Sequence, residues 1–211
     1  GLQKLKQHPG LITETIGPAE ESRPVPIRLL RETEALFCTF PPSNLDAAKS
    51  LRLIQIASAG YSQLIGLELP QKDIRACNAL GVFDCPIAEW NIAMMINLAR
   101  DFRGMVRNQE SGTWDRNARF QREVRGLTVG IWGYGGIGRE TARIAKAMGM
   151  KIHVLVRDRI KPRREVYMVE GTGDPDGGYP DKVLSLEQKV DFLRSLDFLV
   201  LAIPLTPANE G

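Results

Sequence analysis

Residues 127–138 read LTVGIWGYGGIG, and this stretch decides the fold. An apolar run rich in β-formers, residues 127–132, leads directly into the pattern G-x-G-x-x-G at residues 133–138. Helical spacing then continues through Met148. A strand, a glycine turn and a helix in this order are the start of a dinucleotide-binding βαβ unit.

Each glycine of the turn has a distinct expected task. Gly133 allows the tight turn, Gly135 lets a pyrophosphate approach the backbone, and Gly138 permits close packing of helix on strand. Backbone amides near Gly136 and Ile137 then face the phosphates, where the helix N-terminus adds partial positive charge. A purely structural glycine turn is the alternative. The residues predicted to bind the cofactor here are Gly133, Tyr134, Gly135, Gly136, Ile137 and Gly138.

The segments that follow continue the same pattern. Residues 151–156 read as a second strand, residues 185–195 as a helix, and residues 197–203, DFLVLAI, as a third strand buried on both faces. This predicts an α/β fold with a doubly wound parallel sheet, of which the chain holds the first βαβαβ half. The glycine- and proline-rich connection at residues 157–184 is far longer than usual and predicts an insertion or mobile loop.

The N-terminal part predicts a second, smaller α/β domain. Residues 35–40 and 51–57 are short apolar runs that read as strands. Residues 43–50 between them, and residues 70–80 after them, read as helices. We place the domain boundary after residue 85, giving a smaller domain over 1–85, which the family resemblance described below implies to be an incomplete substrate domain, and a dinucleotide-binding domain over 86–211.

The longest helical signal spans about residues 86–109, with Pro86 in its first turn. Ile87, Leu98 and Met105 recur at helical spacing, and Met95 widens the apolar face. A helix with this pattern can pack on two sides, against its own domain and against a partner subunit, so a homodimer is expected. A plain core helix is the alternative.

Residue types around Asp158 leave the choice between NAD and NADP open. Asp158 stands 20 residues after Gly138, where an acid commonly binds the ribose hydroxyls. Arg157 precedes it and four more basic residues follow by position 164, which favours a 2′-phosphate. A solvated loop face is the alternative for the distal part of this cluster.

Composition excludes several classes of protein. The chain has 211 residues, 43% hydrophobic and 25% charged, with a net charge of +3, which argues against a nucleic-acid-binding domain. The uncharged stretch at residues 126–138 is too short for a membrane span, and so is the 15-residue stretch at residues 53–67. Three cysteines without CxxC spacing argue against disulfides and a metal site and favour a cytoplasmic location. Since His8 and His153 have no placed partner, no catalytic residue and no hydrolytic triad is predicted.

Four segments together resemble the D-isomer-specific 2-hydroxyacid dehydrogenases. They are LRLIQIASAGYSQL at 51–64, AEWNIAMMINLAR at 88–100, TVGIWGYGGIG at 128–138 and DFLVLAIPLTPANEG at 197–211. The resemblance implies a flavodoxin-like substrate domain beside the Rossmann domain. It also implies hydride transfer between NAD(P) and a small D-2-hydroxy or 2-oxo acid.

The resemblance assigns further site residues by position. It implies that the amides of Ala59 and Gly60 face the substrate carboxylate and nicotinamide side. It also implies that residues after the third strand line the cofactor, namely Ile203, Pro204, Thr206 and Asn209. Where the family has a ribose-binding acid at the end of the second strand, this chain has Val156 and Arg157, so strict NAD preference is not implied.

The family's catalytic groups have no counterpart in the sequence. Members carry, in a second βαβ half, an arginine for the substrate carboxylate and an acid-assisted histidine; neither is found before Gly211. We therefore expect an incomplete representation of both domains, an exposed edge on the first Rossmann strand, and no turnover by this chain alone. A non-catalytic, dinucleotide-sensing interaction protein of the corepressor type is the alternative function.

Overall fold

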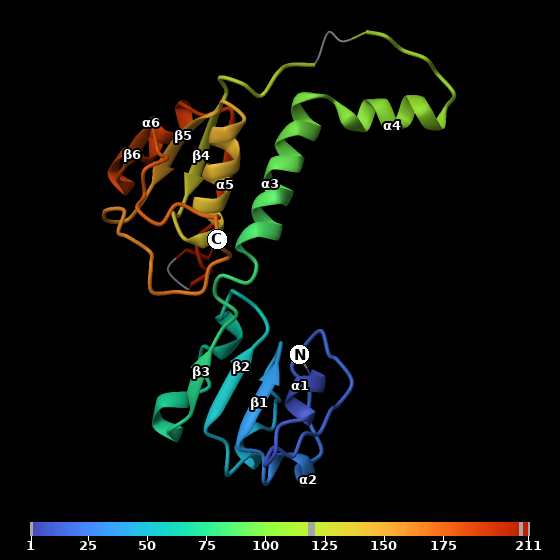
Figure 1. Cartoon of the computed structure of the whole chain (residues 1–211), viewed down its shortest axis with the longest axis vertical. Helices are drawn as coiled ribbons and strands as arrows, with labels where there is room; N and C mark the ends of the chain where they lie inside the picture. Colours follow the sequence, from blue (N-terminus) through green and yellow to red (C-terminus); the bar gives the residue numbers. More distant parts are fainter. Residues whose placement is uncertain (1, 118–120, 207–208, 211) are drawn as a thin grey trace. The chain divides into compact units, whose positions relative to one another are not determined.

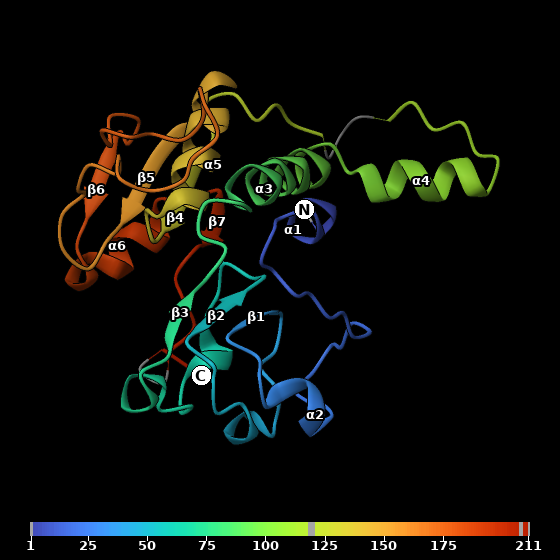
Figure 2. The same cartoon turned by 60° about the horizontal axis from the view of Figure 1, so that its bottom comes forward.

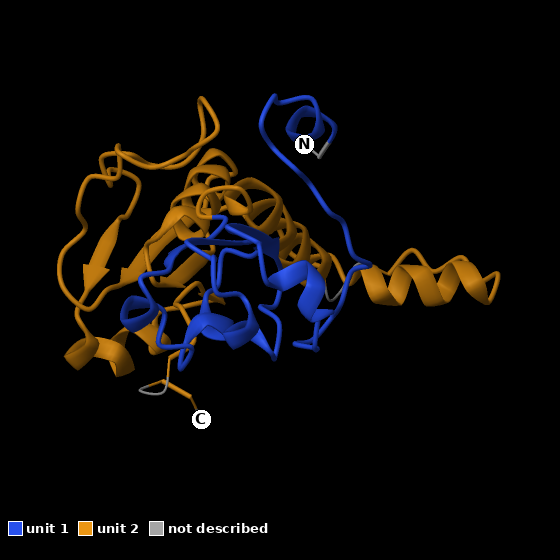
Figure 3. Ribbon diagram, turned by 90° about the horizontal axis from the view of Figure 1, so that it is seen from below, with its two compact units in different colours: residues 1–79 blue, residues 80–211 orange. Residues whose placement is uncertain are grey.

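The chain forms two compact units, residues 1–79 and 80–211 (Figure 3). The structure is a computed structural model and describes residues 2–117, 121–206 and 209–210. Each unit has its own parallel sheet and its own buried core.

The first unit is built on three short parallel strands in the order β1-β2-β3 (Figure 1). These are β1 (Ala35–Cys38), β2 (Leu53–Ile56) and β3 (Arg75–Cys77), accompanied by helices α1 (Leu2–Lys6) and α2 (Ile27–Leu30). Ile54 and Ile56 alternate on β2 and are completely buried, because the central strand turns every second side chain into the core.

Two helices predicted in this unit are wrong. Residues 43–50 contain only a 3₁₀ turn at Leu45–Ala47, and residues 70–80 contain a 3₁₀ turn at Leu69–Lys72 followed by β3. Asp73 adopts a left-handed conformation, with φ of 54°, which ends the turn. The chain then pairs with β2 through Arg75 opposite Leu53, so tertiary pairing overrides the local helical pattern.

The second unit contains a parallel sheet with strand order β6-β5-β4-β7 (Figure 2). Its strands are β4 (Thr128–Trp132), β5 (Lys151–Leu155), β6 (Lys182–Leu184) and β7 (Phe198–Leu201). Helix α5 (Gly136–Ala147) connects β4 to β5, and α6 (Lys189–Arg194) follows β6. The predicted α/β fold with a doubly wound parallel sheet is confirmed.

Strand order corrects two further predictions. The connection at 157–184 hides a strand, β6, and the segment predicted as the third strand is the fourth, β7, which pairs with the opposite side of β4. Hence β4 has neighbours on both sides, and its expected exposed edge is absent. Instead β7 is an outer strand, and Leu201 is 65% exposed rather than buried on both faces.

Both faces of this sheet are covered. Ile152 and Val154 on β5 pack with Ala142 of α5 in the larger core cluster. On the other face Leu155 packs with Phe192 of α6, both completely buried. Burial on both sides explains the nearly continuous apolar sequence of β4.

The helix predicted at 86–109 is divided into α3 (Asp84–Ala99) and α4 (Phe102–Glu110). Asp101 causes the break: it has φ of 47°, and its carboxylate accepts a hydrogen bond from the Gly104 amide at 3.3 Å, capping a new helix. Figure 1 shows α3 beside α5 and α4 leaving in a different direction.

Helix α3 is apolar on two faces, as its sequence predicted. The face that packs on α5 is formed by Ala88, Ile92, Met95 and Ala99, all buried. The other face leaves Leu98 72% exposed and continues to Phe102, while α4 contains no buried residue. An apolar surface therefore remains available on this unit.

Candidate functional site

The carboxyl ends of β4 and β7 meet where the strand order of the sheet reverses. The chain runs from β4 to β5 to β6 in one direction and then crosses to β7 on the other side of β4. In open α/β sheets this reversal creates a crevice at the carboxyl ends of the strands, where ligands bind. The predicted glycine turn follows β4 directly at this place.

The three motif glycines have three different surroundings. Gly133 has φ of 96°, and a Cβ there would lie 2.8 Å from the Ala202 carbonyl oxygen. A Cβ on Gly138 would lie 2.5 Å from the Gly133 carbonyl oxygen, so helix and turn require its absence. At Gly135 a Cβ would meet nothing within 4 Å, which leaves the backbone open on that side. The turn thus provides the open backbone approach that a pyrophosphate needs.

Residues predicted after β7 lie beside the turn. A Cβ on Gly133 would come within 2.7 Å of Ile203 Cγ2, so the two predicted segments meet. Beyond it, the Asn209 side chain donates to the Pro204 carbonyl at 2.8 Å and accepts from the Thr206 amide at 2.7 Å. These bonds join Asn209 to Pro204 and Thr206; cofactor contacts by these residues stay a prediction.

The long connection folds back onto the glycine turn through Asp174. The part of this connection that precedes β6, residues 157–181, is called the 157–181 loop. Asp174 Oδ2 accepts hydrogen bonds from the Tyr134 hydroxyl at 2.6 Å and the Tyr179 amide at 3.0 Å, and Oδ1 accepts from the Gly177 and Gly178 amides. Burial opposes ionisation, but these hydrogen bonds outweigh it, and the pKa of Asp174 lies below its ordinary value.

Arg139 fastens both limbs of the loop to the turn. Its side chain is buried and donates to three backbone carbonyls, those of Tyr134 at 3.1 Å, Asp174, and Lys161. Its guanidinium also lies 5.0 Å from the centre of the Tyr134 ring. A buried cation requires such a set of acceptors. Because Tyr134 is engaged with the loop, its predicted part in cofactor binding would rest on its backbone.

Glu140 adds a third attachment of the loop to α5. Its buried carboxylate accepts from the Gly173 amide at 2.5 Å and pairs with Arg143 at 2.6 Å. The loop is therefore held at the N-terminal end of α5 by contacts of Tyr134, Arg139, Glu140 and Asp174.

A concavity of about 390 Å³ opens where the loop leaves β5. It is lined by Tyr134, Arg139 and residues 156–163, which include the predicted Arg157 and Asp158. Asp158 is exposed and pairs with Lys161 at 3.5 Å. Arg157 and Arg159 form no ion pair within the described ranges, so their charges are available to an anion.

Asp84 and Arg163 meet beside the first residue of α5. Asp84 begins α3, is buried, and accepts from Arg163 Nη1 at 3.2 Å. Its carboxylate lies against Gly136, the first residue of α5. It occupies the space that a Cβ on residue 136 would need. Sequence reasoning included Arg163 only in the basic cluster that favours a 2′-phosphate, and it assigned Asp84 no role in the site.

The predicted substrate turn lies in the first unit, directly after β2. The Asn78 side chain donates to the Ala59 carbonyl at 2.7 Å, and the Ser58 hydroxyl donates to the Gly60 carbonyl at 2.8 Å. The amides of Ala59 and Gly60 donate to no described residue. A turn whose carbonyls are held and whose amides are open can accept an anion.

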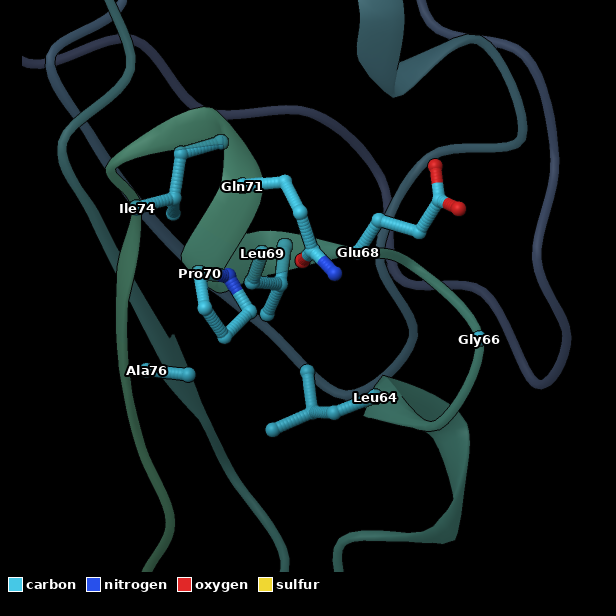
Figure 4. A pocket seen from close by; sticks show the side chains of 8 residues that line it. All are labelled: Leu64, Gly66, Glu68, Leu69, Pro70, Gln71, Ile74 and Ala76. Carbon is cyan, nitrogen blue, oxygen red and sulfur yellow. The ribbon is translucent and has the colours of Figure 1, made fainter.

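The first unit also has a shallow concavity of about 480 Å³ between the 3₁₀ turns at Ser62–Leu64 and Leu69–Lys72 (Figure 4). Leu64, Leu69, Pro70, Ile74 and Ala76 give it an apolar lining, and the Glu68 carboxylate points away from them. Its lining contains neither Ala59 nor Gly60 and no basic residue, so it offers no positive charge to a carboxylate substrate.

The two histidines are engaged in local contacts. His8 is exposed and bonds the Pro9 carbonyl, while His153 on β5 contacts the Ser195 hydroxyl at 2.9 Å. Burial, and then the nearby Lys182, lower the pKa of His153. Burial raises the pKa of Cys38 to about 11, so its thiol is protonated at neutral pH. In the described part of the chain no three potential metal ligands cluster, and no helix there is long and apolar enough to cross a membrane.

Sequence reasoning missed most of the buried charges of the site. Arg139 and Glu140 follow the motif directly but look like ordinary helix-surface residues. Asp174, before Pro175 and near Gly177-Gly178, carries the signal of a side chain that bonds following amides, but nothing local identifies Tyr134 as its partner.

Comparison with known proteins gives a consistent result. Residues 92–211 match the family model for the NAD binding domain of D-isomer specific 2-hydroxyacid dehydrogenases. Among curated proteins, the chain is 30% identical over 223 aligned positions to the glyoxylate reductase of Thermococcus kodakarensis, covering 100% of this chain and 62% of that protein. It is 28% identical to the hydroxypyruvate reductase of Thermotoga maritima, covering 79% of this chain and 48% of that protein.

A solved structure shows the same fold. The probable 2-hydroxyacid dehydrogenase of Rhizobium etli, in complex with NADP, superposes with a TM-score of 0.64 at 25% identity. The match covers 86% of this chain and 52% of that one. The chain thus spans about half the length of the relatives it matches.

Proposed function

The chain belongs to the D-isomer specific 2-hydroxyacid dehydrogenase family. On that premise we propose that the protein is an NAD(P)-dependent oxidoreductase. The proposed reaction moves a hydride between the nicotinamide cofactor and a small D-2-hydroxy or 2-oxo acid. One observation carries the proposal: the glycine turn at the switch point, with an open backbone at Gly135, lies inside the segment that matches the family's NAD-binding domain.

Residues of this chain would bind and orient the dinucleotide. The amides at the start of α5, near Gly136 and Ile137, provide donors and partial positive charge for the pyrophosphate. The bound nicotinamide supplies the hydride chemistry. Ile203 lies beside Gly133 and would contact the cofactor there, and Ala59 and Gly60 would offer open amides to an anionic substrate group.

The cofactor is NAD or NADP, and the loop favours NADP. Arg157 and Arg159 face the concavity at the end of β5 without a carboxylate partner among the described residues, whereas Asp158 is already paired with Lys161. A guanidinium is suited to a 2′-phosphate, and an acid engaged with a lysine is less suited to ribose hydroxyls.

A homodimer through α3 and α4 completes the proposed assembly. The exposed apolar face from Leu98 to Phe102, together with an α4 that buries nothing in its own chain, is the surface that a second copy would cover.

Gly135→Val tests the proposed function. The variant adds a side chain toward open space, so the free protein should fold with unchanged stability, while pyrophosphate approach is blocked. We expect NADH and NADPH binding, measured by fluorescence titration, to fall at least 100-fold, which is about 2.7 kcal/mol. Circular dichroism melting checks the fold.

Gly17→Val is the matched control, because it makes the same change at a site in the other unit where a Cβ meets only the end of Arg23 at 3.9 Å. Unchanged cofactor affinity in Gly135→Val would refute the assignment of this turn.

A further inference from the structure

Arg163 is a buried cation with an incomplete set of partners. Its side chain is only 13% exposed, and its one hydrogen bond from the guanidinium goes from Nη1 to Asp84 Oδ2 at 3.2 Å. Nη2 is buried and has no acceptor among the residues that the structure describes. Leaving a buried charged donor unsatisfied is costly, so this arrangement calls for a further acceptor.

The backbone around Arg163 fixes its position. Its amide donates to the Pro175 carbonyl at 2.8 Å, and the neighbouring Lys161 carbonyl accepts from the buried Arg139. The loop attachments at Asp174 and Glu140 support both segments. Arg163 is therefore presented at this place by a built structure rather than by a free side chain.

Two helix N-termini converge on the partner of Arg163. Asp84 is the first residue of α3, and its carboxylate lies against Gly136, the first residue of α5. Both helix ends carry partial positive charge, and Arg163 adds a full one. The single carboxylate of Asp84 is the anion that occupies this electropositive place in the free protein.

We propose that Arg163 binds the pyrophosphate of the dinucleotide, exchanging the Asp84 carboxylate for phosphate oxygens. This inference rests on the proposed function, because it deepens the assignment of the same glycine turn. The guanidinium offers five donors in a planar fork, so it can satisfy Nη2 and Nη1 together on a phosphate group. The 157–181 loop then contributes directly to cofactor binding.

The charges around Asp84 favour such an exchange. Burial raises the pKa of Asp84; Arg163 opposes this shift, and the Glu140 carboxylate acts in the same direction as burial. Two phosphate charges arriving at α5 would repel the Asp84 carboxylate and attract Arg163. A purely structural ion pair between α3 and the loop is the alternative; it predicts altered stability without altered cofactor affinity.

The test compares Arg163→Met with Arg164→Met. Both remove one positive charge from the same loop, but the Arg164 side chain is 68% exposed and pairs with the exposed Asp176 rather than with Asp84. Dissociation constants of NADH and NADPH are measured by fluorescence titration, with circular dichroism melting of the free proteins. We expect Arg163→Met to weaken binding of both cofactors by about tenfold or more, because both contain the pyrophosphate, and Arg164→Met to stay within about twofold.

Asp84→Asn tests the exchange itself. It keeps the shape of the side chain but removes the charge that competes with phosphate, so affinity for both cofactors should rise about threefold or more. Unchanged or weaker binding in Asp84→Asn would overturn the exchange of partners.

Further outcomes separate this inference from the proposed function. If the parent protein binds NADH and NADPH, and Arg163→Met binds them equally well or loses no more than Arg164→Met, the inference alone is wrong. A parent protein that binds neither cofactor overturns the proposed function and the inference with it. Should Arg163→Met fail to fold, Arg163→Gln, which retains hydrogen-bonding capacity without the charge, decides by the same criterion.

Discussion

Asp174 shows how one carboxylate can hold a long loop against a ligand site. Its two oxygens accept four hydrogen bonds, one of them from the Tyr134 hydroxyl inside the glycine motif. Because the folded pKa of Asp174 lies below its ordinary value of 3.8, the ionised form stabilises the fold. This stabilisation is fully present above pH 3.8 and is lost as the pH falls through the folded pKa.

We therefore expect Asp174→Asn to lower stability at pH 7 by about 1–3 kcal/mol and to flatten the acid side of the profile. Thermal melting from about pH 7 to pH 3 should show the parent and variant curves converging in acid. The control is Asp176→Asn, which changes an exposed carboxylate in the same loop. Parallel curves for the parent and Asp174→Asn would contradict this role.

Arg157 is the residue proposed to recognise the adenosine end of the cofactor. It lines the concavity at the end of β5, and no described carboxylate pairs with it. If its guanidinium binds a 2′-phosphate, Arg157→Ala should weaken NADPH binding by about tenfold or more and leave NADH binding within about twofold. Fluorescence titration with both cofactors measures this ratio. Equal losses for the two cofactors would count against the role.

At the scale of elements, the proposed homodimer depends on the exposed apolar face of α3 and α4. Leu98 is 72% exposed, and Phe102, just beyond the end of α3, is 52% exposed. We expect Leu98→Glu to shift the protein from dimer to monomer in light scattering coupled to size-exclusion chromatography, because a charge cannot be buried there without a partner.

Leu193→Glu is the matched control for this prediction. Leu193 is 45% exposed on α6, in the same unit, and makes the same leucine-to-glutamate change possible away from α3. A monomeric parent protein, or dissociation of both variants alike, would contradict the proposed interface.

The predictability of the elements follows the range of the interactions that form them. The strand, glycine turn and helix at 127–148 could be predicted because the signals are local and mutually consistent. Strand β3 could not, since its three residues are exposed and become a strand only by pairing with β2. The break at Asp101 depends on one left-handed aspartate that also suits a helix surface in sequence.

The candidate site divides along the same line. The roles of three glycines in the turn could be predicted from their spacing and context, namely Gly133, Gly135 and Gly138. A tight turn from strand to helix requires glycine at the first and third of these positions. Asp174 and Arg163 lie 36 and 25 residues beyond Gly138 in a loop whose folding depends on buried polar contacts. No local pattern encodes those partners, because each contact joins segments that are distant in sequence.

At the scale of the whole molecule, binding of the cofactor and catalysis of a reaction are separate questions. The second unit carries the glycine turn, the loop and the basic concavity, which are groups for holding a dinucleotide. An oxidoreductase and a dinucleotide-sensing interaction protein would both need them. Cofactor binding alone does not distinguish these functions, whereas turnover of a 2-oxo acid does.

We predict that residues 1–211 alone bind the cofactor but do not reduce a 2-oxo acid. Such a reduction needs a positioned proton donor, and general acid catalysis contributes about 10² to 10⁴ in rate. His8 is exposed and bonded to the Pro9 carbonyl, and His153 is held on β5 by Ser195 with a lowered pKa, caused first by burial. The assay follows NAD(P)H consumption with glyoxylate, hydroxypyruvate and pyruvate, using a preparation whose intact mass matches these residues. Turnover that persists through further purification and disappears in His8→Gln or His153→Gln would show that one of these histidines reaches the nicotinamide, against the contacts that hold both elsewhere.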